Sequence, residues 1–200
     1  MGGRGAHSKH RTAYTQSDDN DKTIEQLKNE TGADEVIIKG TQYNLKDFKY
    51  NYNNKIAQEL MLNKDEVKKI KENDPDFYKL YKKKEIHEKI AIARDYRDKR
   101  EPKLIEETNT PTFDAVTKKD GIVERTEYKH VENDNFITAR KRLFEAIDQQ
   151  ANRIVLDGFS LSTKHINQVV SEFKNKTGGK LLYNIEIHWL NTTFIFRKEE

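Results

Sequence analysis

The C-terminal part of the chain, from residue 77 onward, alternates between helical and strand-like spacings of its apolar residues. Residues 136–150 and 162–176 each place apolar side chains on one helical face. Residues 153–157 contain the short apolar run Ile154-Val155-Leu156, typical of a central buried strand. This order predicts an α/β fold in which helices flank a mixed sheet. The other elements expected are a helix over 77–100 and strands near 104–105, 111–116, 122–131, 184–189 and 192–197.

The rest of the chain is too polar for uniform packing. Only 34% of the 200 residues are hydrophobic, while 36% are charged. Residues 1–25 hold mostly glycine and polar side chains, which bury too little apolar area to offset chain entropy, so we expect a flexible tail there. Residues 26–76 are expected to form a small N-terminal module of unknown role, ahead of a compact domain at 77–200.

Several classes of protein are excluded or disfavoured by composition. The chain has no cysteine, which excludes disulfides, thiolate metal sites and cysteine nucleophiles. It has no apolar stretch long enough to span a membrane, and no signal peptide follows Met1. We therefore expect action in the cytoplasm, or delivery to a target cell within a phage particle or a secreted system. The opening residues 1–6 resemble the start of many phage-encoded proteins.

A hairpin signal lies at Asp120-Gly121, between two strand-like runs. In a two-residue type I′ turn, Lys119 pairs with Ile122, so the numbers of paired residues sum to 241. Asp114 and Glu127 then stand opposite each other, with their Cβ atoms about 4.5–5.5 Å apart. Lys129 shares their face of the strand because it lies two residues beyond Glu127.

Two carboxylates placed opposite each other destabilise a hairpin unless something offsets their repulsion. A Mg²⁺ or Mn²⁺ ion does so, since Mg²⁺ prefers one or two carboxylates together with water and phosphate oxygens. Lys129 can then orient or deprotonate a water, or stabilise charge on a phosphate. The pattern favours phosphodiester hydrolysis, although an exposed salt-bridged hairpin explains the same residues.

This arrangement resembles the PD-(D/E)xK nuclease superfamily. Within it, the chain is most similar to the tRNA-cleaving C-terminal domains of CdiA toxins, which act in contact-dependent growth inhibition. The resemblance covers roughly residues 80–200. It is carried by Thr110-Pro111-Thr112-Phe113-Asp114, by Glu127-Tyr128-Lys129 and by the run at 150–157. Two residues separate Pro111 from Asp114, where the family often has Pro-Asp together.

The resemblance implies a restriction-endonuclease-like sheet over 77–200 and a metal-dependent endonuclease site. Asp114 and Glu127 would hold the metal, Lys129 would act on water or phosphate, and Glu88 of the preceding helix would assist. Glu85, one turn earlier, is the rival helix acid. The resemblance also implies an RNA substrate, tRNA in particular, ahead of DNA, and a cognate immunity protein if the chain is a toxin.

Other interpretations stay open. Arg140 and Lys141 lie in the helix after Lys129, where they can bind phosphate groups of a nucleic acid or simply form a solvated face. The chain can instead be a metal-independent ribonuclease that uses histidine and lysine, with His165 as a candidate. It can also be a non-enzymatic phage structural or interaction protein. His130 follows the Glu-x-Lys motif but is expected on the opposite face of the strand from Lys129.

Overall fold

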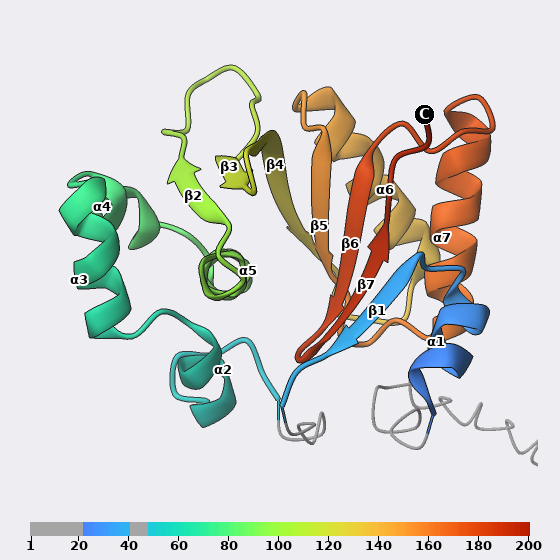
Figure 1. Cartoon of the computed structure of the whole chain (residues 1–200), viewed down its shortest axis with the longest axis horizontal. Coiled ribbons are helices and arrows are strands. Elements are labelled where there is room, and N and C mark those ends of the chain that lie inside the picture. The colour runs from blue at the N-terminus through green and yellow to red at the C-terminus, as the bar shows by residue number, and fades with distance from the viewer. Residues whose placement is uncertain (1–21, 41–47) are drawn as a thin grey trace, which may run out of the picture.

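The computed structural model describes residues 22–40 and 48–200. Seven strands form one open mixed sheet in the order β1-β7-β6-β5-β4-β3-β2. The α/β class expected from the sequence is therefore confirmed, with helices on both faces of the sheet (Figure 1). The strands are β1 (Glu35–Ile38), β2 (Glu101–Leu104), β3 (Ala115–Lys119), β4 (Ile122–His130), β5 (Arg153–Asp157), β6 (Asn184–Trp189) and β7 (Thr192–Phe196).

The helices divide between the two faces of the sheet, each with its own apolar core. One core lies beneath α1 (Ile24–Thr31), α6 (Phe136–Asp148) and α7 (Thr163–Lys176) and includes the buried Leu143 and Phe173. The other lies beneath α3 (Lys64–Asn73), α4 (Phe77–Tyr81) and α5 (Ile86–Arg97), and includes the buried Phe77 and Ile92. A smaller cluster involves α2 (Lys55–Leu60). No helix in these residue ranges is long and apolar enough to cross a membrane.

The hairpin of β3 and β4 has the register expected from its turn. Lys119 pairs with Ile122, and the pairing continues to Ala115 and Thr126. Asp120 and Gly121 both adopt positive φ, 51° and 82°, as a type I′ turn requires. Strand β5 then joins β4 in parallel after α6, because a helical crossover returns the chain to the same end of the sheet.

The single helix expected over 77–100 is wrong. The chain forms α4 and α5 instead, with a turn between them. A new helix begins after Glu85, whose backbone N–H donates to the side chain of Glu88 in the first turn, as in a capping box. The strand expected at 111–116 also starts later, at Ala115.

The N-terminal segment contributes to the same sheet. Strand β1 pairs antiparallel with β7, although the sequence placed it in a separate module at 26–76. Helix α1 begins at Ile24, inside the segment 1–25 that we expected to be a tail. The remaining residues of that expected tail, 1–21, lie outside the described residues.

Candidate active site

An open cleft of about 600 Å³ lies between the β2–β3 connection, β4 and the first turn of α5. Glu88, Asp114, Glu127 and Lys129 all line it, together with Thr108, Pro111 and Thr112 of the β2–β3 connection. The structure thus brings together, in one cleft, the four residues that sequence reasoning selected. Glu88 lies on α5, Glu127 and Lys129 lie on β4, and Asp114 immediately precedes β3, whose pairing with β4 is fixed by the Asp120-Gly121 turn.

Asp114 lies immediately before β3 and is buried. Its backbone N–H donates to the Thr126 carbonyl at 3.1 Å, so it stays beside β4 after the strand pairing ends. Its carboxylate accepts hydrogen bonds from the Tyr128 backbone N–H at 2.9 Å and from Lys84 Nζ at 3.1 Å. These donors hold the carboxylate at the cleft wall.

Glu127 is the member of the group whose carboxylate has an oxygen without a hydrogen-bond partner among the described residues. Its Oε1 lies 2.8 Å from Lys129 Nζ. Its Oε2 is buried and has no hydrogen-bond partner among the described residues. Burial, and then the charge of Asp114, raise the pKa of Glu127 to about 8, although Lys129 acts in the opposite direction. The two buried carboxylates therefore repel each other when both are ionised, and this repulsion favours the protonated form of one of them.

Glu88 has a raised pKa as well. Burial, and then the charge of Asp114, raise it to about 7, against the opposing effect of Lys84. Its Oε2 accepts from the Glu85 backbone N–H at 2.9 Å, which fixes the side chain in the first turn of α5. Glu85 also lines the cleft but is exposed. Of the two rival helix acids, Glu88 is the more buried.

Lys129 is positioned by two oxygen atoms. Its Nζ donates to Gln149 Oε1 at 2.6 Å and lies against Glu127 Oε1. Gln149 follows the end of α6, and its own amide donates to the Thr112 carbonyl at 3.4 Å. The ammonium is therefore held beside the acidic pair, at a place where it can contact a phosphate oxygen or a water in the cleft.

Sequence reasoning missed one basic residue of this region, Lys84. Lys84 is only 6% exposed and contacts Asp114, whereas its neighbours Lys82 and Lys83 are exposed. Burial lowers the pKa of Lys84, but the carboxylates of Asp114 and Glu88 outweigh that effect and raise it above its usual value. A run of three lysines gives no signal as to which one turns inward.

The expected phosphate-gripping residues of α6 lie elsewhere. Arg140 forms an ion pair with Glu172 of α7 at 2.5 Å, and Lys141 lies 3.9 Å from Glu145. The basic residue of α6 that lines the cleft is Arg142. Because helix residues are offset by about 100° each, a cleft at one side of α6 receives one member of the Arg-Lys-Arg run and not its neighbours.

Two histidines lie at one end of the cleft. His87 of α5 and His130 at the end of β4 have ring centroids 3.8 Å apart. Burial, and then the neighbouring His130 and Lys129, lower the pKa of His87 to about 3, so its imidazole is neutral at neutral pH. His165, the candidate for a metal-independent ribonuclease, does not line this cleft. Its Nδ1 contacts Asp134 Oδ1 at 2.6 Å.

The acidic pair fits a divalent cation such as Mg²⁺ or Mn²⁺. The fit rests on the buried, unpartnered Oε2 of Glu127 and on its raised pKa, both of which a nearby positive charge would relieve. Asp114 and Glu127 would hold the ion. When bound, such an ion lowers the pKa of a water and neutralises charge that develops on a phosphate.

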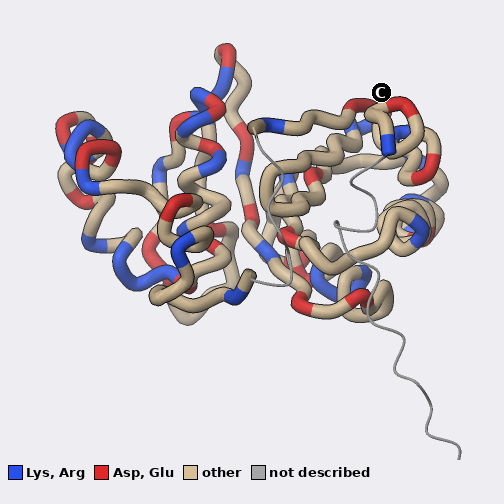
Figure 2. Tube along the Cα trace, turned by 90° about the horizontal axis from the view of Figure 1, so that it is seen from below, with Lys and Arg blue, Asp and Glu red and all other residues tan. Residues whose placement is uncertain are grey.

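Comparison of the chain with protein-family models, with curated proteins and with solved structures finds no match. A functional assignment therefore rests on the chemistry of the cleft. Figure 2 shows that basic and acidic residues are interspersed over the described part of the chain. The arrangement of individual side chains in the cleft is thus more informative than the net charge of +3.

Proposed function

We propose that this protein is a metal-dependent nuclease that hydrolyses phosphodiester bonds. The observation that carries the proposal is the meeting of Asp114, Glu127, Lys129 and Glu88 in one open cleft. The unpartnered Glu127 oxygen and the raised pKa values of Glu88 and Glu127 support it, because groups with perturbed ionisation gather at catalytic sites.

The order of elements around the cleft supports the same assignment. Helix α5 precedes an antiparallel meander of β2, β3 and β4, and α6 then leads to the parallel strand β5. This is the order in which the sequence resemblance to the PD-(D/E)xK nucleases places its acidic helix, its Asp and Glu-x-Lys strands and its second helix. By that resemblance we propose RNA, and tRNA in particular, as the substrate, ahead of DNA.

Each residue has a role that follows from its surroundings. Asp114 and Glu127 would bind the metal, and Lys129, held by Gln149, would contact the scissile phosphate or the attacking water. Glu88 lies close enough to Asp114 for their charges to interact, and would accept a proton or add a ligand through water. If the protein acts as a toxin, we also propose that a cognate immunity protein blocks this cleft.

The proposal is tested by incubating the purified chain with total RNA and with plasmid DNA, in Mg²⁺, in Mn²⁺ and in EDTA. We expect cleavage that requires the metal, is lost in Asp114→Asn and Lys129→Met, and is retained in Asp120→Asn. Asp120 is a suitable control because it is exposed at the hairpin turn, where asparagine tolerates the positive φ.

Three outcomes of that experiment would contradict the proposal. Equal activity in all variants would show that the site assignment is wrong. With His165→Ala and Glu127→Ala included in the assay, cleavage that persists in EDTA and is lost in His165→Ala but not in Glu127→Ala would identify a metal-independent ribonuclease. A wild-type chain that cuts neither substrate in either metal would favour a non-enzymatic structural or interaction protein.

A further inference from the structure

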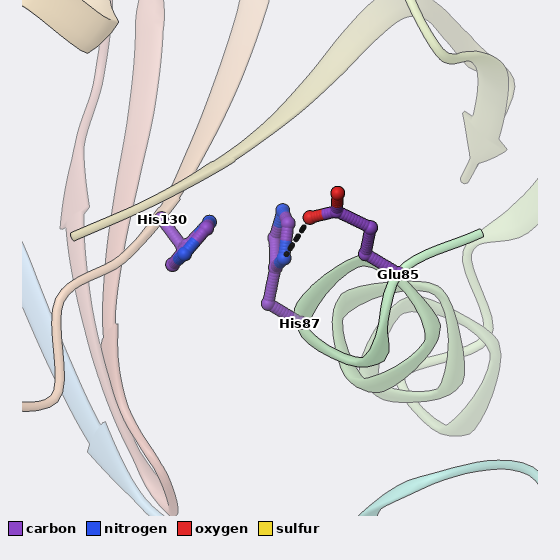
Figure 3. A group of neighbouring side chains, drawn as sticks. All are labelled: Glu85, His87 and His130. Atoms are coloured by element: carbon purple, nitrogen blue, oxygen red, sulfur yellow. Dashed lines mark ion pairs between the residues drawn. The ribbon is translucent and has the colours of Figure 1, made fainter. Parts of the chain in front are cut away.

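Three potential metal ligands gather at one end of the cleft, apart from the acidic pair. Glu85 and His87 come from the start of α5, and His130 is the last residue of β4. One donor atom from each lies within 4.8 Å of the other two. Figure 3 shows the ring of His87 between the ring of His130 and the carboxylate of Glu85.

Packing holds these side chains together. Glu85 Oε2 lies 3.3 Å from His87 Nδ1, and the two imidazole rings are tilted by 35° at a centroid distance of 3.8 Å. The ring of Tyr50 packs edge-on against both, with centroid distances of 6.4 Å to His87 and 5.8 Å to His130. Because His87 is itself buried, its ring has little freedom to leave the group.

The donor set differs chemically from that of the acidic pair. Two imidazoles and a carboxylate suit Zn²⁺ and related transition-metal ions, whereas an all-oxygen set suits Mg²⁺. Zn²⁺ binds nitrogen and carboxylate oxygen at about 2.0–2.2 Å, which places tetrahedral ligands about 3.4 Å apart. Binding of an ion would therefore require side-chain rotations that bring the three donors closer and turn one nitrogen of each imidazole toward the ion. The fourth position would be taken by water or by a group bound in the cleft.

A buried carboxylate also lies on the strand beside His130. Asp157 is its register partner on β5, and it is buried on the strand beside it. The carboxylate oxygens of Asp157 make no hydrogen bond of normal geometry within the described residues. A metal-ligating histidine usually donates its other ring N–H to such a carboxylate. Asp157 is not hydrogen-bonded to His130 in the structure, and it would take this supporting role once His130 binds an ion.

We propose that Glu85, His87 and His130 bind a divalent transition-metal ion of the Zn²⁺ type, with Asp157 as the outer partner of His130. This site is separate from the Asp114–Glu127 pair and does not require that the chain be a nuclease. A bound ion would add positive charge at the end of the cleft.

The test uses the full chain, freed of metal with EDTA and then dialysed, and titrated with Co²⁺ and with Zn²⁺. We expect stoichiometric Co²⁺ binding with the visible absorption of a four-coordinate site, and displacement of Co²⁺ by Zn²⁺. Asp157→Asn should weaken binding by about 10–100-fold, as for an outer partner, and His130→Asn by more. Glu85→Gln supplies a second ligand variant at an exposed position whose capping role glutamine preserves.

Three controls locate the ion. His165→Asn should bind Co²⁺ like the wild type, and so should a variant in which His7 and His10, two histidines of the polar segment 1–25, are both replaced by asparagine. Asp114→Asn should also keep the Co²⁺ spectrum while losing any nuclease activity. The proposal would be overturned if the wild type did not bind Co²⁺, or if both His130→Asn and Glu85→Gln bound it unchanged. It would also be overturned if Asp114→Asn, or the His7 and His10 variant, lost the site. None of these outcomes by itself decides whether RNA or DNA is cleaved.

Discussion

Alternate residues of β4 belong to two buried charge clusters of opposite character. Tyr128 belongs to a closed cluster, in which its hydroxyl donates to Asp95 Oδ2 at 2.7 Å. Arg153 grips Asp95 with two hydrogen bonds of 2.8 Å and also pairs with Glu186. Glu127 belongs to the second cluster, which lines the open cleft and leaves a carboxylate oxygen unpartnered within the described chain.

The contrast separates charges whose hydrogen-bonding capacity is satisfied by the fold from charges whose capacity is not. In the closed cluster, Arg153 supplies a forked donor that matches the Asp95 carboxylate, and the pKa of Asp95 stays below its usual value. In the open cluster, two carboxylates lie beside lysines that satisfy only part of their hydrogen-bonding capacity, and the pKa of Glu127 rises to about 8. Groups with such perturbed ionisation gather at binding and catalytic sites, and we propose that a cation completes this one.

Substitution of Arg153 in the closed cluster should have the largest effect on the free energy of unfolding. Arg153→Met leaves Asp95 and Glu186 without their partner, and removing one member of a buried ion pair costs about 3–5 kcal/mol. Urea unfolding measures this loss. The matched control is Arg197→Met, because Arg197 pairs with Glu35 at an exposed position and should cost about 0–1 kcal/mol. Equal losses in the two variants would remove the distinction that we draw for the closed cluster.

Substitution in the open cluster should act on catalysis instead. Lys129→Met should lower kcat for nucleic-acid cleavage by roughly 10²–10³-fold, as for the loss of one donor that stabilises transition-state charge. Its unfolding free energy should change much less than that of Arg153→Met, because Lys129 lies at the cleft and not within a closed network. If Lys129→Met lowered the unfolding free energy strongly while its folded fraction kept the wild-type kcat, Lys129 would have a structural and not a catalytic role.

The pH dependence of stability should identify Asp95 as a group of the closed cluster. Burial favours its protonated form, but the charge and hydrogen bonds of Arg153 outweigh burial and lower the pKa of Asp95 below 3.8. Its folded-state pKa therefore lies below the unfolded value, so its contribution is present above about pH 4 and is lost as pH falls through the folded value. Asp95→Asn should be less stable than wild type at pH 7, and the difference should shrink below pH 4. Urea unfolding at several pH values measures it, and a constant difference would contradict this account.

The sequence predicted those parts of the molecule that local rules determine. The turn at Asp120-Gly121 determines the pairing of β3 with β4, and thereby the neighbourhood of Asp114 and Glu127. Apolar periodicity placed α6, β5 and α7 within two residues of their observed ends. These predictions succeeded because each depends on residues close together in the chain.

Contacts between distant segments could not be predicted in the same way. Lys84 lies 30 residues from Asp114 in the chain, and Asp95 lies 58 residues from Arg153. No local pattern distinguishes Lys84 from the lysines beside it. Arg153 did carry a signal, since a charged residue beginning a buried apolar strand needs a partner, but the identity of that partner follows only from the packing of α5 on the sheet.

The most direct test of the account is the effect of Mg²⁺ on the unfolding free energy of wild type and Glu127→Gln, measured at pH 7. In EDTA, Glu127→Gln should be the more stable protein, because the raised pKa of Glu127 means that the fold prefers a neutral side chain there. Mg²⁺ at ten times its dissociation constant should stabilise wild type by about 1.4 kcal/mol and Glu127→Gln by much less. Equal stabilisation of the two proteins, or of neither, would contradict the assignment of the acidic pair as a cation site.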